Sequence, residues 1–142
     1  MENLEQDFLK YQAMTTPHPL ALEIKRAKGV YITSTNGKKY LDFVAGVSAC
    51  SLGHRHPKVI SAIRKQINKY MHVMVYGEFA QQPTVQLCKE LVSILPKNQQ
   101  SIFLTNSGTE AIEGALKLAK KATSRNELIG SFKSYHGSTQ GA

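Results

Sequence analysis

Residues 105–111, Thr-Asn-Ser-Gly-Thr-Glu-Ala, have the residue types of an anion-binding turn. Gly108 lets a ligand approach the backbone closely, and the hydroxyls of Ser107 and Thr109 flank the N–H groups that open the next helix. Free N–H groups at a helix N-terminus bind phosphate. The same spacing fits a capping box, because Glu110 follows Ser107 by three residues. The spacing alone leaves both interpretations open.

A second polar loop, residues 134–139, carries Tyr135 and His136. Taken alone, this pair is typical of an ordinary loop. A flat aromatic side chain close to a phosphate site would suit a planar, phosphorylated cofactor. The elements around the two loops decide whether they meet.

The last third of the chain predicts a β-α-β unit, with strands at 101–105 and 127–132 and a helix over 109–123. Such a unit places its two strands in a parallel sheet with a right-handed crossover. Ligands bind beyond the carboxyl ends of parallel strands. We therefore expect Tyr135 on the same rim as the turn that begins at Thr105.

The first two thirds predict helices and a small antiparallel meander. Asn36-Gly37 is a strong hairpin signal between residues 30–33 and 39–43. Residues 44–55 are small and glycine-bearing, which indicates a loop that lies close to another group. Helices are expected over residues 4–13, from Pro57 to about residue 71, and from residue 83 to just before Pro96.

The histidines and cysteines indicate no metal centre or disulfide framework. His54 and His56 have no third ligand at suitable spacing, so we interpret them as structural turn residues. Cys50 and Cys88 lack CxxC pairing and are expected to be reduced thiols of a cytoplasmic protein.

Composition excludes several other classes. The chain has 142 residues, 42% of them hydrophobic, which indicates one folded domain or a piece of a larger one. Its net charge of +8 is spread along the sequence without the motifs of a nucleic-acid-binding protein, so we expect no nucleic-acid partner. No apolar stretch approaches the roughly 20 residues of a membrane span, so no membrane partner is expected. The acidic start is unlike a secretory signal.

Four short motifs follow one another from about Leu20 to the last residue. They are Gly37-Lys-Lys-Tyr-Leu-Asp-Phe43, Gly53-His-Arg-His-Pro57, Asn106-Ser-Gly-Thr-Glu-Ala111 and Tyr135-His-Gly137. Each is weak alone, but their order and spacing together are specific. The chain resembles the N-terminal part of a class III, pyridoxal-phosphate-dependent aminotransferase of the acetylornithine, ornithine and 4-aminobutyrate aminotransferase type.

The resemblance implies an α/β fold, the fold type I of pyridoxal-phosphate-dependent transferases, incomplete in this chain. Residues 1–55 would contribute to the small domain, and residues 56–142 would begin the large domain that binds the cofactor. The complete subunit would form a homodimer with cofactor sites near the subunit interface. The loop that contains Val47 would line the substrate entrance.

The resemblance also implies the cofactor, pyridoxal 5'-phosphate, and the residues that contact it. Ser107, Gly108 and Thr109 would hold the phosphate. Tyr135 would stack on the pyridine ring, and His136 would support the surroundings of that ring.

Two departures from the family pattern bear on activity. The family's catalytic lysine and the aspartate that pairs with the pyridinium nitrogen lie downstream of the aromatic-His-Gly motif, and no lysine here matches by motif. We therefore expect an N-terminal fragment that is inactive alone. Acetylornithine- and 4-aminobutyrate-type members usually carry Arg after that motif, whereas Ser138 stands here. A hydroxyl does not replace arginine's bidentate fork, so an ω-amino acid or another amine donor is equally open.

Two classes of function remain open from the sequence. The parent protein would be a transaminase that moves an amino group from an amino acid or ω-amino donor to a 2-oxo acid, or an aminomutase, racemase or decarboxylase with the same cofactor. Alternatively, the chain is a non-enzymatic remnant or a dimerisation module that binds anions. A downstream lysine preceded by an Asp-x-Gln stretch would decide for the enzyme.

Overall fold

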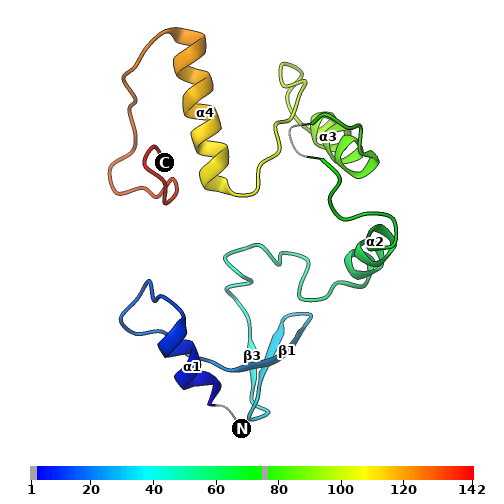
Figure 1. Cartoon of the computed structure of the whole chain (residues 1–142), viewed down its shortest axis with the longest axis vertical. Helices are drawn as coiled ribbons and strands as arrows, with labels where there is room; N and C mark the ends of the chain where they lie inside the picture. Colours follow the sequence, from blue (N-terminus) through cyan, green and yellow to red (C-terminus); the bar gives the residue numbers. More distant parts are fainter. Residues whose placement is uncertain (1–2, 75–76) are drawn as a thin grey trace. The chain divides into compact units, whose positions relative to one another are not determined.

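Seven helices and strands follow one another in the described residues, 3–74 and 77–142, of the computed structural model (Figure 1). In chain order they are α1 (Leu4–Tyr11), β1 (Ile24–Lys28), β2 (Tyr31–Ser34), β3 (Lys39–Leu41), α2 (Pro57–Ile67), α3 (Gln82–Ile94) and α4 (Gly108–Thr123).

The chain divides into two compact units, Met1–Val73 and Met74–Ala142. The first holds α1, the three strands and α2, and the second holds α3 and α4. The division lies 18 residues after the predicted domain boundary at residue 55. A compact stretch of chain is not the same thing as a domain of a complete subunit, so the assignment of 1–55 and 56–142 to small and large domains stays a prediction.

The three strands of the first unit form the predicted antiparallel meander, in the order β1-β2-β3. The β2–β3 loop holds Asn36 and Gly37, and Gly37 has a left-handed φ of 85°. The Ser34 N–H donates to the Lys38 carbonyl at 3.0 Å and closes the loop. A glycine at this position suits a three-residue hairpin loop. The predicted hairpin is confirmed.

Strand β3 stops at Leu41, two residues before the predicted end at residue 43. The cause is Asp42, whose Oδ1 accepts the N–H groups of Val44 at 3.0 Å and Ala45 at 2.9 Å. An aspartate that bonds the backbone ahead of it turns the chain.

Backbone and side-chain bonds tie the Gly53-His54 turn to the meander. Gly29 and His54 exchange two backbone hydrogen bonds, of 2.9 and 2.8 Å. The His54 Nε2 lies 2.6 Å from Asp42 Oδ2, and only 7% of the Asp42 side chain is exposed. The Ala45 N–H bond, and then the His54 contact, hold the pKa of Asp42 below its ordinary value. His54 therefore fixes the turn, the structural role expected for it.

All four predicted helices are confirmed, with shifted ends. Helix α1 ends at Tyr11 rather than residue 13, and α2 has Pro57 in its first turn and ends at Ile67. Their apolar stripes follow the predicted spacing but stay uncovered: Val59, Ile63 and Ile67 of α2 are 41%, 49% and 53% exposed. Among the described residues no hydrophobic side chain is fully buried. In residues 3–74 and 77–142 no helix is both long and apolar enough to cross a bilayer.

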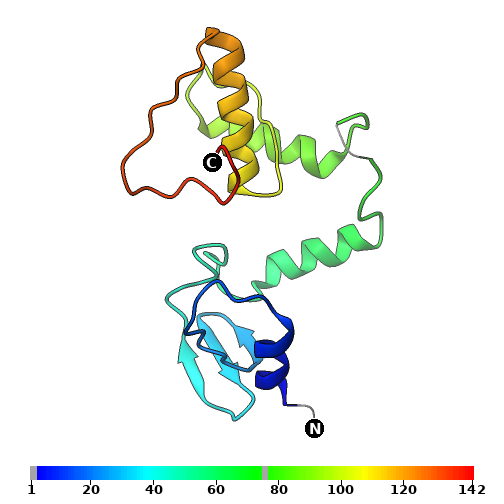
Figure 2. The same ribbon diagram turned by 60° about the vertical axis from the view of Figure 1, so that its left-hand side comes forward.

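The two strands predicted at 101–105 and 127–132 are not formed, so the prediction of a paired β-α-β unit is wrong for the described chain. Helix α4 does form between them, as Figures 1 and 2 show. A helix satisfies its backbone hydrogen bonds within itself, whereas a strand needs a neighbour. Within residues 77–142 no strand lies beside either segment to provide those bonds.

We predict that Gly53→Ala loosens the bridge between Gly29 and His54. Gly53 has a left-handed φ of 83°, and a Cβ there would lie 3.1 Å from the Gly29 carbonyl oxygen. The control is Gly37→Ala, because Gly37 is also left-handed but a Cβ there meets nothing within 4 Å. Both substitutions carry a left-handed penalty of roughly 1 kcal/mol. Only Gly53→Ala should speed amide hydrogen exchange at Gly29 and His54, by about tenfold or more. Equal rates in the two variants would contradict the prediction.

Candidate functional site

The first turn of α4 is closed by reciprocal side-chain caps. Ser107 is the N-cap residue, in extended backbone, and its Oγ accepts the Glu110 N–H at 3.2 Å. The Glu110 Oε2 in turn accepts the Asn106 N–H at 2.7 Å. The Ser107 half of the predicted capping box is therefore present, whereas Glu110 bonds the residue before the N-cap instead of the N-cap itself.

Capping leaves the donors of an anion site free. Within the described residues, the N–H groups of Ser107, Gly108 and Thr109 have no protein acceptor. A Cβ placed on Gly108 would meet nothing within 4 Å, so the backbone there faces open space. A hydroxyl has one hydrogen to donate besides its acceptor sites. Since Ser107 Oγ accepts from Glu110, its own hydrogen is available to a ligand. Capping and anion binding are compatible at this turn.

Thr109 joins this turn to the loop that carries the candidate ring-stacking residue. Its Oγ1 accepts the Ser138 N–H at 3.2 Å, which leaves the hydroxyl hydrogen free to donate. Gly137, with φ of 150°, lies against Thr109: a Cβ there would overlap Thr109 Oγ1 and lie 3.1 Å from Thr109 Cα. Figures 1 and 2 both show the C-terminal segment returning to the first turn of α4.

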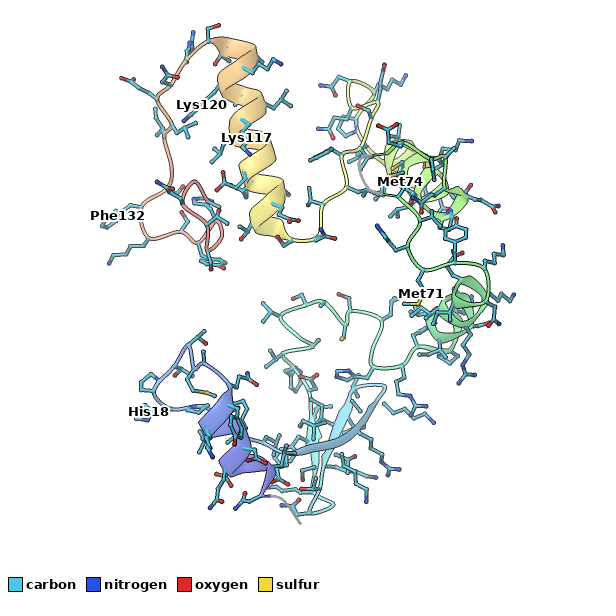
Figure 3. The ribbon with its side chains drawn as sticks, viewed as in Figure 1. His18, Met71, Met74, Lys117, Lys120 and Phe132 are labelled. Carbon is cyan, nitrogen blue, oxygen red and sulfur yellow. The ribbon has the colours of Figure 1, made fainter. Side chains whose placement is uncertain are left out.

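Glu113 holds the far end of the same loop, a role that the sequence did not suggest. Its Oε1 accepts from the Thr139 hydroxyl at 2.6 Å and from the Gly141 N–H at 2.9 Å. These two bonds, with Lys117 and Lys120 adding attraction along α4 (Figure 3), hold the pKa of Glu113 below its ordinary value. The available signal was helical spacing, because Thr109 and Glu113 are four residues apart and share one face of α4.

Tyr135 and His136 lie in the segment between these two anchors and the predicted strand. The Tyr135 side chain is 80% exposed, and its hydroxyl lies 2.9 Å from the Ser138 hydroxyl. His136 is also exposed. Ser138, which stands where the family usually has Arg, thus contacts both Thr109 and Tyr135. The structure thus brings the loop that carries Tyr135 and His136 to the end of α4 that holds Ser107, Gly108 and Thr109.

Val47 lies in the first unit, in an unusual turn. Residues 45–48 have four consecutive left-handed φ angles, of 49°, 62°, 55° and 67°. Left-handed backbone is costly for residues other than glycine. Three backbone bonds hold the turn. The N–H groups of Ser48, Ala49 and Cys50 donate to the carbonyls of Val44, Gly46 and Ala45, at 3.1, 3.4 and 2.8 Å. The Val47 side chain is 87% exposed.

Comparison with known proteins decides the family. A family model, Aminotransferase class-III, matches residues 11–142. The chain belongs to the class III aminotransferases. The fold class expected from the sequence is thereby supported, because solved structures of this family superpose on almost the whole chain. Adenosylmethionine-8-amino-7-oxononanoate aminotransferase from Methanocaldococcus jannaschii covers 96% of this chain, with a TM-score of 0.85 and 31% identity.

Other class III aminotransferases are similar at comparable identity. Taurine:2-oxoglutarate aminotransferase from Bifidobacterium kashiwanohense, solved with PLP and glutamate, matches 97% of this chain at 30% identity and a TM-score of 0.86. Acetylornithine aminotransferase from Bacillus amyloliquefaciens is 39% identical over 83% of this chain. The chain spans 50% of that relative's length, 30% of the length of acetylornithine aminotransferase from Bacillus subtilis, and 31% to 34% of the two solved chains.

We predict that Glu113→Gln loosens the docking of the C-terminal loop on α4. Docking of the loop lowers the pKa of Glu113 below its ordinary value of 4.5. The ionised carboxylate therefore stabilises the docked loop fully above pH 4.5. This stabilisation is lost as the pH falls through the lowered pKa. The Gly141 amide proton shift should therefore titrate in acid in the native chain and not in Glu113→Gln. At pH 7 the variant should exchange that proton several-fold faster. Glu127→Gln is the control, and loss of the titration there would contradict the assignment.

Proposed function

We propose that this chain supplies the part of a transaminase that holds the phosphate of pyridoxal 5'-phosphate and faces its ring. The observation that carries the proposal is the first turn of α4, where capping coexists with three free N–H groups. The positive end of the helix dipole at that turn favours an anion.

The donors at this turn suit a phosphate group. Ser107, Gly108 and Thr109 present backbone N–H groups, and the two hydroxyls accept hydrogen bonds from the protein, so each has a hydrogen left for a phosphate oxygen. The open space at Gly108 removes the steric obstacle to close approach. These residues therefore fit the phosphate of the family's cofactor.

The loop beyond Gly137 supports the role proposed for Tyr135 and His136. Thr109 and Glu113 fasten that loop to α4. Tyr135 therefore lies three residues before Ser138, whose N–H is bonded to Thr109 at the phosphate site. Its exposed ring is available to stack on a flat ligand. The bound cofactor supplies the electron sink of the reaction, and these residues bind and orient it.

The reaction we propose is transfer of an amino group from an amino acid or ω-amino donor to a 2-oxo acid. Support comes from family membership and from the named activities of relatives, such as the taurine:2-oxoglutarate enzyme. Ser138 cannot bind a donor carboxylate with two parallel hydrogen bonds, as an arginine would. The proposed donors therefore include ω-amino compounds as well as amino acids. The complete subunit is proposed to act as a homodimer. Val47 is proposed to face the substrate entrance, which its exposed side chain permits.

Thr109→Ala tests the phosphate site in a complete transaminase subunit. The change removes one hydrogen bond to a charged group, so we expect affinity for pyridoxal 5'-phosphate to fall about tenfold. Affinity for pyridoxal, which lacks the phosphate, should fall much less, because only the Ser138 N–H anchor of the Tyr135 loop is lost there. Thr123→Ala is the control, because it removes a hydroxyl from the other end of α4, where it donates to Ala119 at 2.8 Å. Unchanged phosphate-dependent affinity in Thr109→Ala would show that the helix start is only capped.

The 142-residue chain by itself is proposed to be inactive, because it contains no Asp-x-Gln stretch followed by a lysine. We expect incubation with pyridoxal 5'-phosphate, reduction with borohydride and peptide mapping to label exposed lysines weakly and without preference. One lysine labelled stoichiometrically would contradict this proposal.

A further inference from the structure

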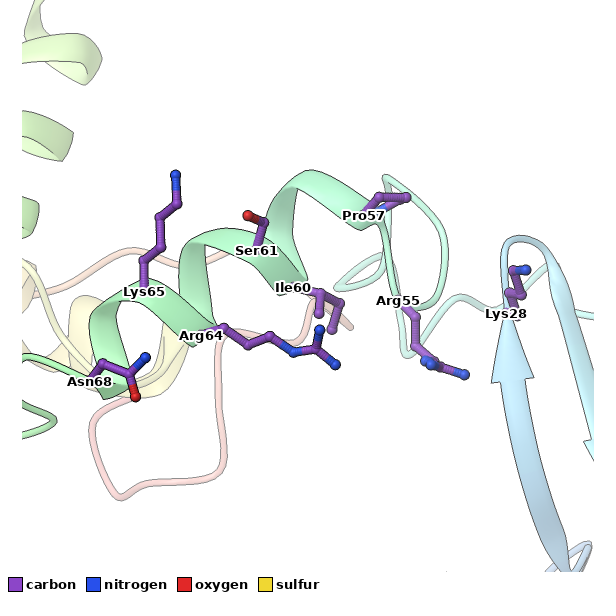
Figure 4. A pocket seen from close by; sticks show the side chains of 8 residues that line it. All are labelled: Lys28, Arg55, Pro57, Ile60, Ser61, Arg64, Lys65 and Asn68. Carbon is purple, nitrogen blue, oxygen red and sulfur yellow. The ribbon is translucent and has the colours of Figure 1, made fainter.

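Six cationic side chains line two adjoining hollows in the first unit. The hollows have volumes of about 480 and 580 Å³, and Figure 4 shows the first. Lys28 and Arg55 line both. We call the six residues the basic cluster: Arg26, Lys28, Lys39, Arg55, Arg64 and Lys65.

Strand register gathers three members of the basic cluster on one face of the sheet. Arg26 pairs with Thr33, and Thr33 pairs with Lys39, so these three side chains form one row across the meander. Lys28 pairs with Tyr31 in the neighbouring row. Residues two apart in a strand point to the same face, so both rows line the same hollow.

The two remaining walls come from the Gly53-His54 turn and from α2. Arg55 follows His54, whose backbone is bonded to Gly29, the residue after Lys28. These backbone bonds bring Arg55 and Lys28 to the wall shared by the hollows. In Figure 4 the Arg64 side chain extends along α2 toward Arg55, whereas Lys65 leaves the helix on another side. Backbone bonds hold the sheet and the turn together, and α2 follows the turn directly in the chain at Pro57.

In residues 3–74 and 77–142, no ion pair neutralises these charges. No acidic residue lines either hollow. The two carboxylates closest in sequence are engaged elsewhere, since Glu23 accepts from the Thr35 hydroxyl at 2.8 Å and Asp42 pairs with His54. Among the described residues, His54–Asp42 is the only ion pair. Cations gathered without counter-charge repel each other, and a bound anion relieves that repulsion.

We propose that the basic cluster is a binding site for a small polyphosphate anion, with phosphate groups between Lys28 and Arg55. Arginine binds phosphate with two parallel hydrogen bonds, and lysine binds it as a point charge. Two concave hollows that share a wall fit a chain of phosphates better than a single ion. Tyr31, on the same sheet face, offers an aromatic surface to any group attached to that chain. The ligand is an inorganic oligophosphate or the phosphate chain of a nucleotide.

The experiment titrates the 142-residue chain with inorganic tripolyphosphate, followed by calorimetry and by amide NMR shifts. We expect one ligand per chain, an affinity that falls as salt rises, and shifts concentrated in residues 26–33, 39 and 54–65. A second titration with ATP distinguishes the sources. Tighter binding with movement of the Tyr31 ring signals supports a nucleotide, and equal binding supports recognition of the phosphate chain alone.

The double variant Lys28→Gln/Arg55→Gln should bind tripolyphosphate at least about tenfold more weakly, because the shared wall loses both charges. The control is Lys58→Gln/Lys69→Gln. It removes one charge from α2 and one from the residues just after α2, and neither lysine lines a hollow. Its affinity for tripolyphosphate should change less than about threefold. Equal losses in the two double variants would overturn the proposal, since they would show bulk charge attraction. Shifts confined to residues 107–109 in the native chain would also overturn it, whether or not the variants fold. Preferential binding of double-stranded DNA over tripolyphosphate would do so as well.

Discussion

The hydrogen bond from the Glu110 N–H to the Ser107 hydroxyl is the interaction on which the candidate site depends. It sets the residue at which α4 begins, and therefore which N–H groups stay outside the helix. With the start at this position, Thr109 comes second in the helix and Glu113 follows one turn later on the same face. The Ser138 N–H, the Thr139 hydroxyl and the Gly141 N–H then find acceptors on that face. A helix that began elsewhere would present neither the free donors nor the loop anchors.

Polar contacts, rather than a hydrophobic core, fix the details of the first unit. Among its described residues, 3–73, the buried ones are the polar Thr33 and Ser34. The exchange of hydrogen bonds between Gly29 and His54 joins two loops that are far apart in sequence, and the Asp42 contact holds the imidazole in place. Because backbone bonds have defined geometry, they place neighbouring side chains as well. This explains how charges that are separate in the sequence come to face one space.

What could be predicted from the sequence was what forms locally. The Asn36-Gly37 hairpin, the proline-started helix at Pro57 and the Ser107–Glu110 cap each depend on residues a few positions apart, and each is present. The strands at 101–105 and 127–132 could not be judged this way, because a strand exists only with a partner. Ser107, Gly108 and Thr109 were recognised from their types, but the Glu113 contacts join residues 26 and 28 positions apart. The basic cluster was missed for a similar reason, since only strand register puts Arg26 and Lys39 in one row, on either side of Thr33.

The spacing of the loop contacts along α4 limits how the protein can vary. Gly137 and Ser138 meet Thr109, while Thr139 and Gly141 meet Glu113, four residues and about 6 Å further along the helix. The loop is thus matched to one helical turn, and a single inserted or deleted residue between 137 and 141 would put one of the two anchors out of reach. Residues 131–134 form an exposed local turn, closed by bonds from Ser134 to the Ser131 carbonyl, and changes of its length leave the spacing of the two anchors unchanged. Among related sequences, insertions and deletions should therefore gather before Tyr135, and a directed-evolution library should vary chain length only there.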